Sequence, residues 1–163
     1  MFFLVPDVLL TSLALKSFKR AAIAALAAAL AAAFGGLLIW LCAHWVPVET
    51  KNILLIVPGI SETTFGTVKV LFAHGAFSGM LQGAFSGIPY KVFAAEAGFT
   101  GINPILFVIL TPIVRLPRFL VLSLVAWSLS QAIGTRLAPM TKLLMTLALW
   151  CVFYIGYFSA IGW

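Results

Sequence analysis

The stretch Phe85–Phe119, FSGIPYKVFAAEAGFTGINPILFVILTPIVRLPRF, decides the fold and the function expected of this chain. It is strongly apolar and broken by prolines, yet it holds Lys91, Glu96, Arg115 and Arg118, four of only fourteen formal charges. A charged side chain at membrane depth costs about 2.5–3.5 kcal/mol on insertion scales. We therefore expect these side chains to serve an ion, a proton or an anionic headgroup.

The composition is that of a membrane protein. Hydrophobic residues make up 63% of the chain and charged residues 9%, whereas soluble domains contain about 25% charged residues. Several apolar runs approach the length of about 20 residues that crosses a bilayer. The sequence predicts an all-α integral membrane protein that forms a single domain over residues 1–163.

Positive charges orient this domain. Lys16, Lys19 and Arg20 precede the first long apolar run, and Arg136 and Lys142 flank a later loop. Loops rich in lysine and arginine remain in the cytoplasm. We therefore expect a cytoplasmic N-terminus and a C-terminus on the outer side.

Three transmembrane helices are expected, over residues 20–45, 103–135 and 141–163. The second of them is expected to be broken, because Pro112 and Pro117 interrupt its backbone hydrogen bonds. Residues 46–69 carry charges that cancel and a helix-cap signal at 61–64, so this segment is expected along the outer surface.

Two other segments are too short or too broken to span. Residues 1–15 are interrupted at Pro6 and residues 70–100 at Pro89. Non-helical backbone at membrane depth needs protein or a watery cavity around it. We expect two re-entrant hairpins with tips at these prolines, entering from opposite sides, in an inverted-repeat arrangement with a site at the midplane.

Small residues recur at spacings that suit close helix contact. Stripes of this kind let helix backbones approach one another in a membrane, so we expect these glycines to pack helices rather than to bind a ligand. They are Gly75, Gly79, Gly83 and Gly87, and the pair Gly35 and Gly36 after an alanine-rich run.

The charged residues suggest a phosphate site. Arg115 and Arg118 are three residues apart, so they project from one face of a helix. Paired guanidinium groups match phosphate oxygens, and Lys91 adds a third positive charge. We expect Asp7 and Glu96 to pair with these arginines at rest, for example Asp7 with Arg118 and Glu96 with Arg115.

Alternatives to phosphate binding stay open at this point. The ion pairs could serve only to hold the hairpins, and Arg115 could extend along its helix to the interface. A carboxylate beside an arginine is also a candidate proton carrier, since burial raises and arginine lowers its proton affinity. A substrate phosphate would then displace the acid and trigger its protonation.

Signals of other function classes are missing from the sequence. It has no GxSxG, no HExxH and no phosphate-cradling glycine loop. It has no long polar basic surface for a nucleic acid. Cys42, Cys151, His44 and His74 lack the spacing of metal ligands. We expect no enzymatic activity, no cofactor and no metal.

Several of these motifs resemble the DedA superfamily, also called VTT-domain or SNARE-associated proteins, and most of all its YqaA-like branch. They are GIPYKVF at 87–93, AEAG at 95–98 and RLPRF at 115–119. The N-terminal VPDVLL at 5–10, with 19–21 and 35–36, resembles the first hairpin and helix of that branch. The resemblance covers roughly residues 3–130.

This resemblance implies a bacterial inner-membrane protein with two opposed re-entrant hairpins. Members with assigned roles move undecaprenyl phosphate or phospholipids, some with dependence on the proton gradient. The family acids correspond here to Asp7, and the arginines after the second hairpin to Arg115 and Arg118. This chain departs from the family pattern in having Pro6-Asp7 where Pro-Gly-Glu is usual, and Tyr90-Lys91 where many members have arginine.

We expect a lipid translocase or scramblase that acts on lipids with anionic headgroups, with or without coupling to protons. The alternative is a non-transporting scaffold or assembly factor for envelope homeostasis that uses the glycine stripe for partner contact. A small ion channel is a third reading. A homodimer is compatible with so small a helix bundle.

Overall fold

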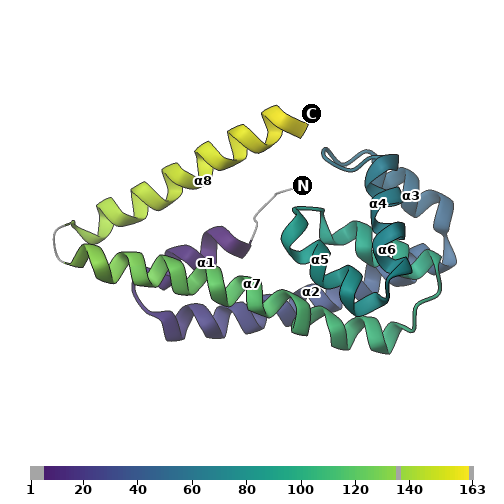
Figure 1. Ribbon diagram of the computed structural model, residues 1–163, viewed down its shortest axis with the longest axis horizontal. Helices are drawn as coiled ribbons and strands as arrows, with labels where there is room; N and C mark the ends of the chain where they lie inside the picture. Colours follow the sequence, from purple (N-terminus) through teal and green to yellow (C-terminus); the bar gives the residue numbers. More distant parts are fainter. Residues whose placement is uncertain (1–5, 135–136, 162–163) are drawn as a thin grey trace. The chain divides into compact units, whose positions relative to one another are not determined.

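A computed structural model describes residues 6–134 and 137–161, and all the regular structure in these ranges is helical. The all-α prediction is confirmed. Figure 1 labels the helices, which are α1 (Pro6–Ala14), α2 (Phe18–Trp45), α3 (Pro47–Leu55), α4 (Glu62–Ala73), α5 (Ala76–Ser86), α6 (Tyr90–Phe99), α7 (Pro104–Ile133) and α8 (Pro139–Ile161).

Three helices are long and apolar enough to cross a membrane. They are Phe18–Trp45, Pro104–Ile133 and Pro139–Tyr157, and they agree with the three predicted spans. The 28 residues of α2 extend over about 42 Å, more than the roughly 30 Å of a hydrocarbon core. The chain is therefore a membrane protein.

The expected break in the second span is wrong. α7 continues through Pro112 and Pro117 as a single helix of 30 residues. Prolines are tolerated in membrane helices because neighbouring groups satisfy the backbone around them.

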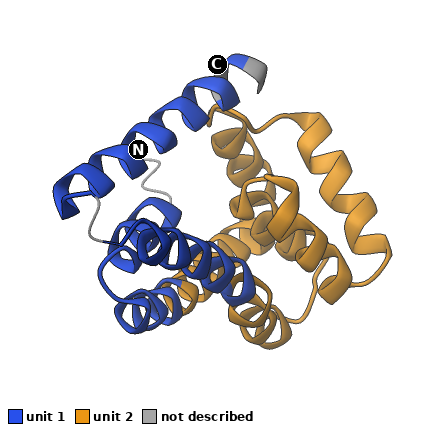
Figure 2. Ribbon diagram, turned by 60° about the vertical axis from the view of Figure 1, so that its left-hand side comes forward, with its two compact units in different colours: residues 1–28, 116–162 blue, residues 29–115, 163 orange. Residues whose placement is uncertain are grey.

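The chain forms two compact units, which Figure 2 shows in blue and orange. Unit 1 comprises residues 1–28 and 116–162, and unit 2 comprises residues 29–115 and 163. The boundaries fall inside α2 and α7, so each of these helices contributes to both units.

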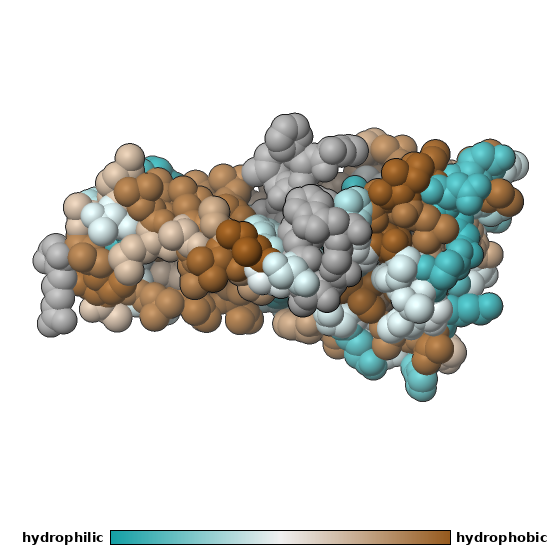
Figure 3. All heavy atoms as spheres, turned by 90° about the horizontal axis from the view of Figure 1, so that it is seen from above, coloured by the Kyte–Doolittle hydropathy of each residue, from teal (hydrophilic) through white to brown (hydrophobic). Residues whose placement is uncertain are grey.

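In unit 1, α1 packs against α8 (Figure 1). On α2, Ala21 and Ala25 are fully buried, whereas Ile23 and Leu26 are exposed. Large apolar side chains of α8, such as Leu149 and Val152, are exposed as well, and brown apolar atoms are frequent on the face that Figure 3 shows. Small residues inside and large apolar residues outside are the pattern of a helix in lipid.

In unit 2, α6 lies among the short helices α3, α4 and α5 (Figure 1). Its residues 92–98 are all buried, and they form the centre of the core. Trp40 of α2 closes this core, and its indole Nε1 donates to the Ile102 carbonyl oxygen at 3.0 Å. Burial on all sides fixes the positions of the side chains at residues 92–98.

The segment 46–69 forms α3 and the first part of α4, and the cap signal at 61–64 is confirmed. The backbone N–H of Thr64 donates to Ser61 Oγ at 3.3 Å, and the N–H of Ser61 donates to Thr64 Oγ1 at 3.3 Å. This capping box starts α4 at Glu62, whose carboxylate pairs with Lys51 at 2.8 Å. The placement of the segment at the outer surface remains a prediction.

The second hairpin has the predicted turn but a shorter first arm. α5 and α6 are joined by residues 87–89, with Pro89 as the N-cap of α6. The first arm begins at α5 and not at Val70, because the chain turns at Gly75 after α4. The 11 residues of α5 cover about 16 Å, too little to cross a bilayer. Re-entry into the membrane remains a prediction.

The first hairpin is described only from its tip onward. α1 begins at Pro6, and proline is favoured at the first helical position because its missing N–H has no helical partner there. The expected arm before Pro6 lies outside the described residues.

Three of the six glycines have the packing role expected of them. A Cβ on Gly36 would overlap the Tyr90 hydroxyl, and a Cβ on Gly83 would overlap the Phe93 ring. A Cβ on Gly79 would lie 2.7 Å from the Leu71 carbonyl oxygen. These glycines allow side chains or backbone of a second helix to approach.

The packing role is wrong for the other three. A Cβ on Gly35 or Gly87 would meet nothing within 4 Å, and one on Gly75 would make only an ordinary contact. Gly75 and Gly87 instead have φ of +106° and +78°, where side chains are strained. They end one helix and begin the next, so the four-residue repeat combines two different physical roles.

Candidate functional site

An ion pair at the N-terminus of α1 is the central feature of unit 1. Arg118 Nη2 lies 2.7 Å from Asp7 Oδ2, as the sequence predicts. The Asp7 side chain is 1% exposed and the Arg118 side chain is 36% exposed. The carboxylate is therefore enclosed by protein, while part of the guanidinium side chain remains accessible from outside.

The position of Asp7 suits a negative charge. It lies in the first turn of α1, where the helix dipole stabilises an anion. Its Oδ2 accepts from Arg118, whereas its Oδ1 is buried and has no hydrogen-bond partner among the described residues. A buried oxygen of this kind costs about 1–3 kcal/mol when it makes no hydrogen bond.

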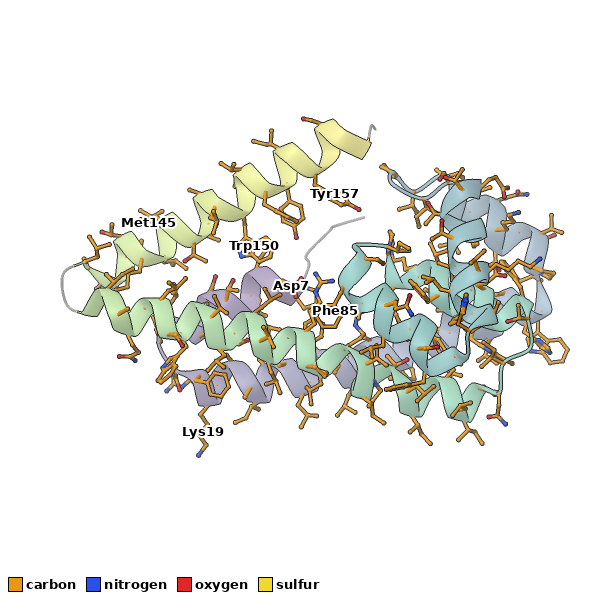
Figure 4. The ribbon with its side chains drawn as sticks, viewed as in Figure 1. Asp7, Lys19, Phe85, Met145, Trp150 and Tyr157 are labelled. Atoms are coloured by element: carbon orange, nitrogen blue, oxygen red, sulfur yellow. The ribbon has the colours of Figure 1, made fainter. Side chains whose placement is uncertain are left out.

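α8 contributes polar groups beside this pair. The Thr11 hydroxyl donates to the Asp7 carbonyl oxygen at 2.8 Å and accepts from Trp150 Nε1 at 3.0 Å. Figure 4 shows Trp150 directed from α8 towards α1, whereas Met145 points away from it. Trp150 also stacks on Tyr154, with ring centroids 5.8 Å apart.

Sequence analysis missed these contributions from α8. It treated residues 141–163 only as an apolar span, because no formal charge beyond Lys142 marks that helix. The available signal was the pair Trp150 and Tyr154 at a spacing of four, which places two polar aromatic tips on one helix face.

A second polar cluster lies in unit 2. The Arg115 guanidinium carbon is 4.5 Å from the centre of the Tyr90 ring, a cation–π contact. The Tyr90 and Thr111 hydroxyl oxygens are 2.7 Å apart. Thr111 donates its single hydroxyl hydrogen to Phe107, so Tyr90 is the donor to Thr111. Burial raises the pKa of Tyr90 to about 12, although Thr111 and Arg115 act to lower it.

The expected pairing of Glu96 with Arg115 is wrong. In the described part of the chain no ion pair joins them, and the cations that act on the buried Glu96 are Lys69 and Lys51. Burial raises the pKa of Glu96, and these lysines partly offset the shift. Glu96 follows Tyr90 by six residues, which is about 240° around α6. It therefore faces away from the side on which Arg115 contacts Tyr90.

The three cations expected to share one phosphate are distributed over the two units. Arg118 belongs to unit 1, and Arg115 and Lys91 belong to unit 2, where Lys91 is exposed in the first turn of α6. The structure brings Asp7 to Arg118 and Tyr90 to Arg115. The joint phosphate site remains a prediction.

No family model, curated protein or solved structure matches this chain. The resemblance to the DedA superfamily therefore remains a hypothesis that rests on the motifs at residues 5–10, 87–98 and 115–119.

Proposed function

We propose that this chain is a transporter-like protein of the bacterial inner membrane that moves a phosphate-bearing lipid between leaflets, either undecaprenyl phosphate or a phospholipid. The observation that carries the proposal is the ion pair between the buried Asp7 and the partly exposed Arg118. Membership of the DedA superfamily and a cytoplasmic N-terminus with a periplasmic C-terminus belong to the same proposal.

The energetics of the pair favour a functional role. Removing two charges from water costs several kcal/mol per ion, and well-packed apolar residues are often as stable in the same place. Ionisable residues within apolar membrane proteins commonly mark pathways for ions or substrates. A buried acid that is tied to an accessible arginine has the character of such a site.

The proposed cycle exchanges one anion for another on Arg118. A lipid phosphate reaches the exposed part of the guanidinium and replaces the Asp7 carboxylate, because phosphate oxygens match the planar fork in two hydrogen bonds. Asp7, released into a protein interior, takes up a proton. When the phosphate leaves, Asp7 loses that proton and pairs with Arg118 again.

Other charged residues have secondary roles in this proposal. Arg115 and Lys91 are further phosphate contacts during passage, and Glu96 is a second proton acceptor. The acyl chains remain in the bilayer against exposed apolar side chains such as Ile109, Ile113 and Leu124 of α7. Only the headgroup then needs a polar path.

Lipid movement in liposomes that contain the purified full chain tests the proposal. Labelled phospholipid and labelled undecaprenyl phosphate are separate substrates. We expect Arg118→Ala to lower the rate at least tenfold, and Asp7→Asn to remove its dependence on a proton gradient. Arg20→Ala is the matched control, because Arg20 is an exposed arginine of the same unit.

An unaltered rate in well-folded Arg118→Ala would overturn the proposal. No movement of either lipid by the wild-type chain would also overturn it and would favour the scaffold or assembly factor.

A further inference from the structure

We propose that a second site in unit 1, separate from the Asp7–Arg118 pair, binds a phosphate group. It is a cavity of about 640 Å³ between the C-terminal end of α1 and the N-terminal turn of α8. Lys16 and Lys142 both line it, and Asp7 and Arg118 do not. Ligand pockets commonly occupy about 300–1,000 Å³, so the cavity has the size of a headgroup site.

The ammonium group of Lys142 is held in place. Its Nζ donates to the Ser130 carbonyl oxygen at 2.8 Å and to the Ser130 hydroxyl oxygen at 3.3 Å. Ser130 in turn donates its hydroxyl hydrogen to the Leu15 carbonyl oxygen at 3.0 Å. An ammonium has three hydrogens, so one remains for a ligand. Ser130 of α7 and Leu15, the residue that follows α1, together position this donor of α8.

No acidic residue of unit 1 balances the charge of the cavity. Asp7 is the single acidic residue in the sequence of this unit, and its carboxylate is bound to Arg118. Lys16 and Lys142 therefore bring two positive charges to one cavity without a carboxylate among its lining residues. An anion with more than one oxygen would balance both.

The start of α8 adds to the positive potential. Pro139 and Met140, the first two residues of this 23-residue helix, line the same cavity. The first N–H groups of a helix have no intrahelical partner and, with the helix dipole, favour phosphate; Pro139 has no N–H, so Met140 is the first residue of α8 that can supply one. The Ser12 hydroxyl also lines the cavity but donates to the Val8 carbonyl oxygen at 2.7 Å, so it does not contribute a hydrogen.

The rest of the lining is apolar. Leu15, Met140 and Leu143 border the cavity, and Met140 is 66% exposed. A phosphate on a lipid and a free phosphate ion both meet the requirement for two ammonium groups and a helix N-terminus. Only the lipid would also use the apolar rim.

Binding to the full chain in neutral detergent distinguishes these sources. The probes are a short-chain phosphatidic acid, the corresponding diacylglycerol without phosphate, and inorganic phosphate as a competitor. We expect phosphatidic acid to bind to the wild-type chain. The dissociation constant should rise about tenfold in Lys142→Gln, and it should rise further in Lys16→Gln/Lys142→Gln than in Lys142→Gln. Diacylglycerol should not bind. If inorganic phosphate displaces phosphatidic acid, the phosphate ion itself is a ligand of the cavity. If inorganic phosphate does not displace it, the ligand is the lipid.

Lys19→Gln is the matched control, because Lys19 is exposed, does not line the cavity and points away from α1 in Figure 4. Equal losses in Lys19→Gln and Lys16→Gln would overturn the proposal, as would undiminished binding in the double variant. Should Lys142→Gln not fold, Lys16→Glu is the deciding variant, because Lys16 is exposed and reversal of its charge should remove the part of the binding that Arg118→Ala leaves. Lipid movement does not enter this experiment, so failure here leaves the proposed exchange at Arg118 untouched.

Discussion

The hydroxyl group of Tyr90 occupies the space that a β-carbon on Gly36 would fill. Gly36 thus lets the Tyr90 side chain of α6 lie against α2, and Tyr90 in turn contacts Arg115 and Thr111. The packing of α2 therefore supports the polar cluster of unit 2.

Substitution of the two neighbouring glycines should give opposite results. Gly36→Ala should lower the free energy of unfolding by about 1–3 kcal/mol, the usual cost of overpacking. Gly35→Ala should leave it unchanged or raise it by up to about 1 kcal/mol, because alanine is the better helix former and nothing lies within 4 Å. Thermal unfolding of both variants in one detergent is the measurement. Equal destabilisation would contradict the placement of Tyr90.

The Asp7–Arg118 pair should show strong coupling in a double-mutant cycle. Arg118→Met leaves a buried carboxylate without its cation, which costs up to about 3–5 kcal/mol, less here because Arg118 is partly exposed. Asp7→Asn/Arg118→Met should lose less stability than Arg118→Met alone, because the amide carries no charge. Chemical unfolding of the four proteins measures the coupling, and simple additivity would count against the pair.

Glu96 should make stability depend on pH in a defined direction. Its pKa is raised in the folded protein by burial, so the folded state holds its proton more tightly than the unfolded state. The contribution to stability is complete below the ordinary pKa and is lost as pH rises through the folded pKa. Glu96→Gln should therefore melt higher than wild type at neutral pH and show little difference in acid.

Glu49→Gln provides the comparison for Glu96, since Glu49 is an exposed glutamate of the same unit. Its melting temperature should follow wild type across the pH range. If the melting temperature of Glu96→Gln exceeds that of wild type by more in acid than at neutral pH, the pKa of Glu96 is not raised in the folded protein.

The Tyr90 hydroxyl should lose its proton at a higher pH than an ordinary phenol. Burial raises its pKa to about 12, against about 10 for a free tyrosine. The phenolate absorbance of wild type minus that of Tyr90→Phe should appear only near that pH. A difference signal with a midpoint near 10 would mean that the ring is open to water.

Much of the fold could be predicted because membrane spans depend on long runs of one property. The predicted span 20–45 begins two residues after the start of α2 and has the same end. The cap at Ser61 was also predictable, because capping depends on neighbours in the sequence. Pro112 and Pro117 led to the wrong prediction of a broken helix, because a proline inside a membrane helix does not by itself end that helix.

Only the charged residues of the candidate site could be predicted from the sequence. Asp7 and Arg118 could be paired because so few opposite charges exist in the chain. Adjacent positions on a helix are about 100° apart around its axis. Gly36 faces Tyr90 and Gly35 does not, and no pattern in the sequence distinguishes the two. Trp150 and Thr11 carry no charge, so their contact beside Asp7 appears only in three dimensions.

A contact between a lipid phosphate and Arg118 is the central claim, and solid-state NMR tests it most directly. The measurement is dephasing between phosphorus of a phospholipid and nitrogen of labelled arginine guanidinium groups, for wild type and Arg118→Lys in the same bilayer. We predict strong dephasing in wild type that falls clearly in Arg118→Lys. Equal dephasing in both proteins would place the phosphates at other arginines and would contradict the exchange of Asp7 for phosphate.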